Sequence, residues 1–209
     1  MSKIKLPHAS GNSMSIGAPA TNPSGDLELK LPATIGTAGQ VLRNSSTPGT
    51  LEFGANITEV DQWRLNTTAN TSDSVLTANW ERNDTAGFEK IGTGMSESSG
   101  IFSFPSTGKW KIFFHSAFAK ASSDVRYVGG QIQFTINNSS YQSFAQAYAN
   151  LFNDGTSCWG DYATECIVDV TDVSQCKVKF RVSAATTIDF IGTSTENYTY
   201  AIFTRIGDT

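Results

Sequence analysis

Residues 100–112, with the sequence GIFSFPSTGKWKI, decide the fold class of this chain. Two apolar runs, at residues 101–104 and 110–118, are separated by a turn around residues 106–108. The second run carries a large apolar side chain at every second position: Trp110, Ile112 and Phe114. A period of two residues is the side-chain period of a β-strand that buries one face. The stretch therefore predicts two strands joined by a turn.

The same pattern recurs through the rest of the chain beyond residue 56. Further strands are expected at residues 131–136, 165–170, 176–182 and 198–206. Their alternating apolar side chains include Ile132, Phe134, Ile136, Cys176, Val178, Phe180 and Val182. Turns are expected at residues 129–130, 137–140, 153–155 and 191–193, because Gly, Asn, Asp and Ser favour turns. Many short strands at this spacing predict an all-β antiparallel sandwich or jelly roll.

Residues 143–152, SFAQAYANLF, fit two interpretations. Phe144, Tyr148 and Leu151 lie at helical spacing, but the turn expected at residues 137–140 precedes them. A turn at that place is typical of a hairpin, so we expect a strand here.

The composition agrees with a β structure and excludes several classes of function. Charged residues make up only 16% of the chain, and Ser, Thr, Asn and Gly, which are poor helix formers, are abundant. The net charge of −4 argues against a nucleic-acid partner, which needs a basic face. No apolar run approaches the roughly 18 residues of a membrane span, so no membrane partner is expected. The first residues lack the apolar stretch of a signal peptide, which predicts synthesis in a cytoplasm.

Residues 1–55 differ from residues 56–209 in proline content and in the length of their apolar runs, and we expect two domains with that boundary. Five of the six prolines lie in the first segment, between short apolar patches. Leu27, Leu29 and Leu31 alternate with charged residues and predict a two-faced strand, and Val41 and Leu42 form another apolar patch. Such a segment cannot bury enough apolar area alone to offset its ordering entropy. We therefore expect an extended β arm that intertwines with its copies and serves attachment and trimerisation.

Catalytic chemistry is poorly represented, and we predict a protein that is not an enzyme and has no metal or cofactor. The chain has two histidines, His8 in the arm and His115 in an expected strand, where it is interpreted as half-buried and hydrogen-bonded. Cys158, Cys166 and Cys176 lack the close spacing of zinc ligands, and Cys176 is expected in the core. Paired carboxylates could serve a glycosidase, and the closest candidates are Asp169 and Asp172, followed by Asp154 and Asp161.

One segment has residues suited to recognition. Trp159, Asp161 and Tyr162 occur together in residues 158–162, which we expect to form a loop. Aromatic rings stack on sugar faces while a carboxylate orients hydroxyl groups, so a glycan contact is one hypothesis. The favoured alternative is that Trp159 fills the end of the sandwich or a subunit interface.

Residues 100–112 and the closing stretch 198–203, YTYAIF, resemble the C1q/TNF-like jelly rolls. That family has an aromatic strand, a turn with glycine, a second aromatic strand, and a last strand near a trimer axis. The resemblance covers roughly residues 57–209 and implies a homotrimer.

Residues 27–34, 36–42 and 51–54 resemble the opening of tail-fibre and appendage proteins of tailed phages, in particular cyanophages. This resemblance implies a virion surface protein, either a fibre or a capsid decoration on head or tail. Its arm would attach to other virion proteins and its knob would face outward, with a host surface glycan as a further partner. A stand-alone glycan-binding module resembling a lectin is the alternative function.

Overall fold

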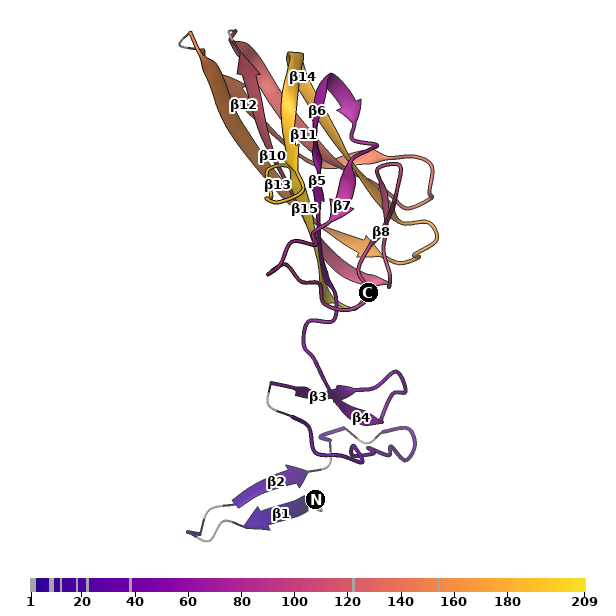
Figure 1. Cartoon of the computed structure of the whole chain (residues 1–209). Coiled ribbons are helices and arrows are strands. Elements are labelled where there is room, and N and C mark those ends of the chain that lie inside the picture. Colours follow the sequence, from indigo (N-terminus) through magenta and orange to yellow (C-terminus); the bar gives the residue numbers. More distant parts are fainter. Residues whose placement is uncertain are drawn as a thin grey trace. The chain divides into compact units, whose positions relative to one another are not determined.

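The computed structural model describes residues 3–7, 10–11, 13–17, 19–21, 23–37, 39–121, 123–153 and 155–209. The chain divides into two compact units, Met1–Asn56 and Ile57–Thr209. All elements of the described residues are strands (Figure 1). The described residues contain no helix that is long and apolar enough to cross a membrane. His8 and Asp154 lie outside the described residues.

The first unit contains two separate hairpins. Strands β1 (Lys3–Pro7) and β2 (Ser13–Gly17) pair with each other, and β3 (Val41–Asn44) pairs with β4 (Leu51–Gly54), both in antiparallel register. The prediction of a strand at residues 27–31 is wrong, because this segment makes only a single parallel bridge, between Lys30 and Thr50. The backbone hydrogen bonds to Gly49 and Leu51 reach this segment only at Lys30, so no ladder extends along the alternating leucines.

The second unit is built from eleven strands. They are β5 (Val60–Leu65), β6 (Thr67–Val75), β7 (Trp80–Arg82), β8 (Ser96–Ser98), β9 (Ile101–Ser103), β10 (Gly108–Ala121), β11 (Val125–Thr135), β12 (Gln142–Leu151), β13 (Ser157–Val170), β14 (Lys177–Thr193) and β15 (Tyr200–Gly207). The strands expected from the sequence are present, and residues 143–152 form most of a strand, β12, as predicted. β10, β11, β13 and β14 are longer than predicted, because polar outward positions interrupt the apolar signal without interrupting the ladder.

These strands form the two layers of a jelly roll (Figure 1). One layer has the order β13-β10-β15-β5-β7, and the other has β12-β11-β14 followed by β6 and β9 along the far edge of β14. The layers join where β10 meets β14, at the pairs Phe118–Phe190 and Ala119–Asp189. Every pairing between these strands is antiparallel.

Aromatic side chains fill the space between the layers. The rings of Phe114 on β10 and Phe180 on β14 stack with centroids 4.6 Å apart. Phe102 lies edge-on to Trp63 and Trp80, at 5.5 and 5.2 Å. Full burial of such a side chain contributes about 1.5–3 kcal/mol, so this cluster supplies much of the folding free energy. Cys176 is fully buried among these residues, as predicted.

Two details of the predicted pattern are wrong. Residues 129–130 and 191–193 lie inside β11 and β14 and do not form turns. Close contacts explain the glycines there: a Cβ at Gly130 would lie 2.3 Å from the Tyr162 hydroxyl, and one at Gly192 would lie 2.5 Å from the Thr67 carbonyl oxygen. Ile136 is 68% exposed, since β11 ends at Thr135 and the chain bends there.

Candidate subunit interface

The outer face of the β13-β10-β15-β5 layer carries a row of apolar side chains and two of the predicted site residues, Trp159 and Asp161. Strand alternation turns Phe113 on β10 and Tyr200 and Ile202 on β15 away from the core, while Phe114, Ala201 and Phe203 are buried. We name the half-buried residues Phe113, Tyr200 and Ile202 the apolar strip. Together with Lys111, Glu165 and Thr204 they line a shallow hollow of about 410 Å³.

The aromatic rings of the apolar strip are in contact with one another. Phe113 and Tyr200 lie with centroids 5.8 Å apart, and the His115 ring lies 5.1 Å from Tyr200. Partial burial raises the pKa of Tyr200 above its usual value, so this phenol stays neutral in ordinary solution. The strip therefore presents an uncharged surface to whatever covers it.

Ion pairs between β10 and β13 border the strip on one side. Lys109 pairs with Asp169, the Nζ of Lys111 lies 2.7 Å from a carboxylate oxygen of Glu165, and His115 contacts Asp161. Each pair is partly exposed, so its net contribution to stability is at most about 1 kcal/mol. An apolar centre with a charged border is the usual anatomy of a protein–protein interface.

The predicted recognition segment is a strand and not a loop, since residues 157–162 open β13. Alternation separates its three residues: Trp159 and Asp161 point outward, with Trp159 64% exposed, while Tyr162 is buried against Phe114 and Phe118. Burial raises the pKa of Tyr162 far above its usual value. The structure therefore brings two of the three residues together on the outer face and removes the third from any surface site.

His115 is half-buried and hydrogen-bonded, as predicted. Its Nδ1 lies 2.7 Å from the backbone oxygen of Tyr198, and its Nε2 lies 3.1 Å from Oδ2 of Asp161. Both ring nitrogens face oxygen acceptors, so neither is directed at a nucleophile, as catalysis by a serine or cysteine would need.

The carboxylates considered for a glycosidase also have other contacts. Asp169 pairs with Lys109, and Asp172 accepts hydrogen bonds from the backbone nitrogen and hydroxyl of Ser174, at 2.8 and 2.7 Å. These hydrogen bonds lower the pKa of Asp172. In the described part of the chain, no group of three or more His, Cys, Asp or Glu side chains is placed to hold a metal ion.

The predicted arm residues are at the surface of the first unit. Leu27, Leu29 and Leu31 are 80%, 63% and 75% exposed, and Val41 and Leu42 are 40% and 50% exposed. Among the described residues of the first unit, these side chains are not packed into a core.

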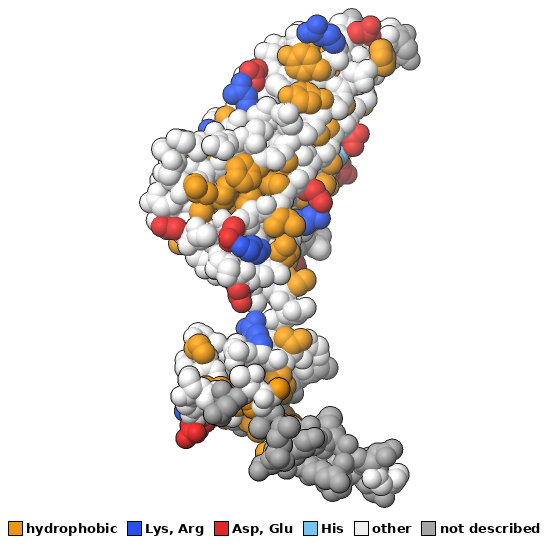
Figure 2. Space-filling view, turned by 180° about the vertical axis from the view of Figure 1, so that it is seen from behind, with side chains coloured by type: hydrophobic (Ala, Val, Ile, Leu, Met, Phe, Trp, Pro, Cys, Tyr) orange, Lys and Arg blue, Asp and Glu red, His pale blue; other side chains and the backbone are white. Residues whose placement is uncertain are grey.

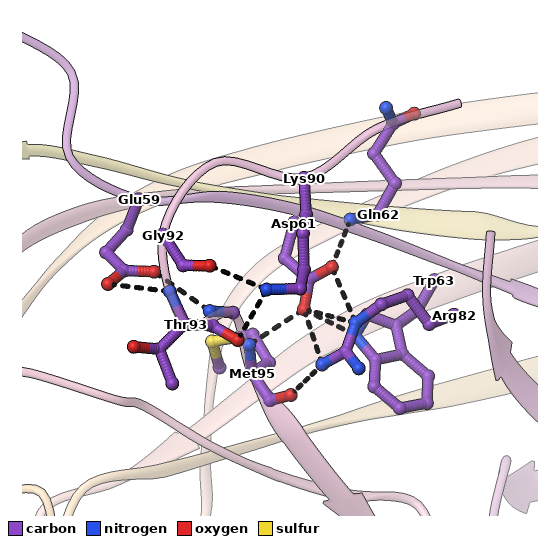
Figure 3. A network of polar contacts seen from close by, with 10 residues as sticks. Glu59, Asp61, Gln62, Trp63, Arg82, Lys90, Gly92, Thr93 and Met95 are labelled. Carbon is purple, nitrogen blue, oxygen red and sulfur yellow. Dashed lines mark hydrogen bonds and ion pairs between the residues drawn. The ribbon is translucent and has the colours of Figure 1, made fainter. Parts of the chain in front are cut away.

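A buried polar network, which the sequence did not reveal, anchors the loop before β8 (Figure 3). Asp61 is 1% exposed, and its carboxylate accepts hydrogen bonds from Trp63 Nε1 at 2.8 Å and from the backbone nitrogen of Met95 at 2.7 Å. Arg82 completes the site with an ion pair at 3.0 Å. Glu59 holds the same loop through the backbone nitrogens of Thr93 and Gly94. Because donors surround the Asp61 carboxylate, we interpret this network as structural.

The comparisons with known proteins identify the fold. No model of a known family matches the chain, and no curated protein matches it either. The solved structure of Eiger TNF from S. frugiperda is similar to it at 10% identity with a TM-score of 0.51, and the match covers 74% of this chain and 95% of that one. Murine APRIL at pH 5.0 aligns at 11% identity with a TM-score of 0.46, covering 70% of this chain and 98% of that one. The chain thus shares the TNF-like jelly-roll fold.

Proposed function

We propose that this chain is a non-enzymatic subunit of a virus particle, which assembles as a homotrimer through the apolar strip and displays its second unit at the virion surface. The apolar strip is the observation that carries the trimer. Phe113, Tyr200 and Ile202 form a continuous uncharged surface with a charged border, whereas isolated exposed apolar residues would need no explanation.

A closed trimer suits this surface better than an open chain of subunits. Rotational symmetry covers the same patch on each copy and leaves no patch free at the ends. The TNF-like fold supports this proposal: in the C1q/TNF-like domains that residues 100–112 and 198–203 resemble, the last strand lies near a trimer axis, and β15 is the last strand of this chain.

The first unit supports a role in attachment. Its exposed leucines Leu27, Leu29 and Leu31 need a partner surface, and copies of the arm or other virion proteins would provide one. Residues 27–54 also carry the resemblance to phage appendage proteins. The low charge of the whole chain suits a surface exposed to varied salt, because salt screens charged groups and only 16% of the residues are charged.

Two measurements test the proposal. Light scattering of the purified full chain should give three times its mass of 22.5 kDa, and a stable monomer would contradict the trimer. Antibodies against residues 57–209 should label intact tailed particles encoded by the genome that carries this chain. Gold label on the capsid would assign a head decoration and label on the tail would assign a fibre, while unlabelled particles would exclude the virion role.

A further inference from the structure

The outer face of β11 and β12, on the other layer of the jelly roll, has a different chemistry from the apolar strip. Tyr148 on β12 pairs with Gly129 on β11. A Cβ at Gly129 would lie 2.2 Å from Cδ1 of Tyr148, so the phenol ring occupies the space that a side chain would fill. Tyr148 nevertheless remains 53% exposed. The ring is therefore held against the sheet and keeps a surface open to solvent.

A second tyrosine fixes the position of this ring. Tyr127 lies edge-on to Tyr148, with centroids 6.2 Å apart and an interplanar angle of 76°. Edge-to-face pairs of this kind are favourable by about 0.5–1.5 kcal/mol. Tyr148 is thus restrained from beneath by the Gly129 backbone and from the side by Tyr127.

Neutral amide side chains continue the surface beyond the ring. The Nε2 of Gln133 donates to Oε1 of Gln131 at 3.1 Å, and Gln131 Nε2 donates to Oε1 of Gln146 at 3.5 Å. Each amide both donates and accepts, which matches the dual character of sugar hydroxyl groups. The amides are already aligned by one another, which lowers the entropy lost when a ligand binds.

This surface carries few charges, and the one cation of β11, Arg126, lies 5.7 Å from the centroid of the Tyr127 ring. β12 contains no charged residue. On the neighbouring strand β14, Lys179 lies over the Tyr141 ring at 4.0 Å and Arg181 is paired with Asp73 at 2.5 Å. Among the described residues of β14 near Tyr148, the cations are therefore already engaged.

We propose that this face binds a neutral oligosaccharide, with Tyr148 stacking on a sugar ring and Gln131, Gln133 and Gln146 bonding its hydroxyl groups. This inference rests on the proposed function, since it names the ligand class and the surface through which the displayed unit would adhere to a host. A second copy of the chain fits the face less well, because amides stand where a subunit interface would carry aliphatic side chains. Figure 2 shows one face of the molecule, on which hydrophobic patches and scattered charged side chains stand among uncharged side chains and backbone.

The test uses the full chain and a panel of immobilised probes. The neutral probes are mannan, galactan, maltoheptaose and cellohexaose, and the anionic probes are alginate, dextran sulfate and a sialylated oligosaccharide. We expect binding to at least one neutral probe. Tyr148→Ala should weaken it by about tenfold, as the loss of a stacking contact implies, and Tyr148→Phe should keep it within about twofold.

Two further variants separate this site from the rest of the surface. Gln131→Ala should weaken binding without removing the ring, and Trp159→Ala tests the other candidate glycan contact, an exposed aromatic on the other layer, whose loss should abolish binding only if that segment holds the ligand. The inference is overturned if no neutral probe binds, if only anionic probes bind, or if Trp159→Ala and not Tyr148→Ala abolishes binding.

Light scattering of each variant distinguishes the two proposals. A trimer that binds no neutral probe overturns the glycan site and leaves the subunit assembly standing. A monomer whose binding depends on Tyr148 supports the glycan site and contradicts the trimer.

Discussion

His115 and Asp161 lie on neighbouring strands, with the imidazole Nε2 3.1 Å from a carboxylate oxygen. The Asp161 side chain is 69% exposed in the single chain and lies on the face that the proposed trimer covers. An exposed pair of this kind contributes about 1 kcal/mol or less, while cover by a partner subunit would strengthen it by excluding water.

A double-mutant cycle with His115→Gln and Asp161→Asn should therefore show a dependence on assembly. The coupling in the free energy of unfolding should be about 1 kcal/mol or less in a monomeric background and larger in the trimer. Urea unfolding followed by tryptophan fluorescence measures both values. Equal coupling in the two backgrounds would argue against cover of Asp161 by a partner.

The monomeric background for this cycle requires a variant that does not form the trimer. Ile202→Asp should dissociate the trimer, because a carboxylate in the middle of the apolar strip loses its hydration when subunits meet. Analytical ultracentrifugation should show one chain of 22.5 kDa in place of three. Asn150→Asp makes a similar change in charge on β12 and should leave the trimer intact, and a trimeric Ile202→Asp variant would refute the assigned interface.

The buried carboxylate of Asp61 should be important for stability. Asp61→Ala leaves Arg82, Trp63 Nε1 and the Met95 nitrogen without their acceptor. Arg82 is 36% exposed, but the Trp63 Nε1 and Met95 nitrogen donors are buried, and a buried donor left unsatisfied costs about 1–3 kcal/mol, so the midpoint of urea unfolding should fall markedly. Glu89→Gln, at an exposed position of the same loop, is the control and should change the midpoint little. A similar midpoint for both variants would show that the network is dispensable.

Two adjacent glycines of β11 should respond differently to the same substitution. Gly130→Ala places a methyl group 2.3 Å from the hydroxyl of Tyr162, which is only 5% exposed and has no room to move. Overpacking of this kind costs about 1–3 kcal/mol. Gly129→Ala meets the ring of Tyr148, which is 53% exposed and can move outward, and the backbone oxygen of Ala147 at 2.8 Å, so thermal denaturation should show a loss that is smaller but still measurable. The reverse order would mean that the core accommodates Tyr162 elsewhere.

The thiol of Cys166 should react slowly. Burial, with a smaller contribution from the Glu165 carboxylate, raises the pKa of Cys166 to about 11. At pH 8 only about one thiol in a thousand is then ionised, and the rate of alkylation should rise about tenfold per pH unit. Glu165→Gln removes a negative charge, lowers the pKa and should speed the reaction. Peptide mapping after iodoacetamide treatment measures the rate at this cysteine, and a rate equal to that of the urea-unfolded chain would contradict the prediction.

The strand content and the buried faces could be predicted from the sequence. Trp110, Ile112 and Phe114 are buried as their alternation predicted, because one face of a strand between two layers must exclude water. The same reasoning identified Phe180 and His115 correctly. It failed at Gly129 and Gly130, where glycine serves close packing of two tyrosines and makes no turn. It failed again at Leu29, since alternation predicts a strand only where a partner strand exists.

The sequence alone determined that the chain is all-β, that its two segments differ, and that it is poor in catalytic groups, because these properties depend on local periodicity and composition. Only the tertiary structure decided which residues share a surface. It separated Tyr162 from Trp159 and Asp161, placed Phe113 beside Tyr200, and brought Tyr148 over Gly129. The physical reason is that neighbouring residues of a strand point to opposite faces, while the register between strands depends on packing across the whole core.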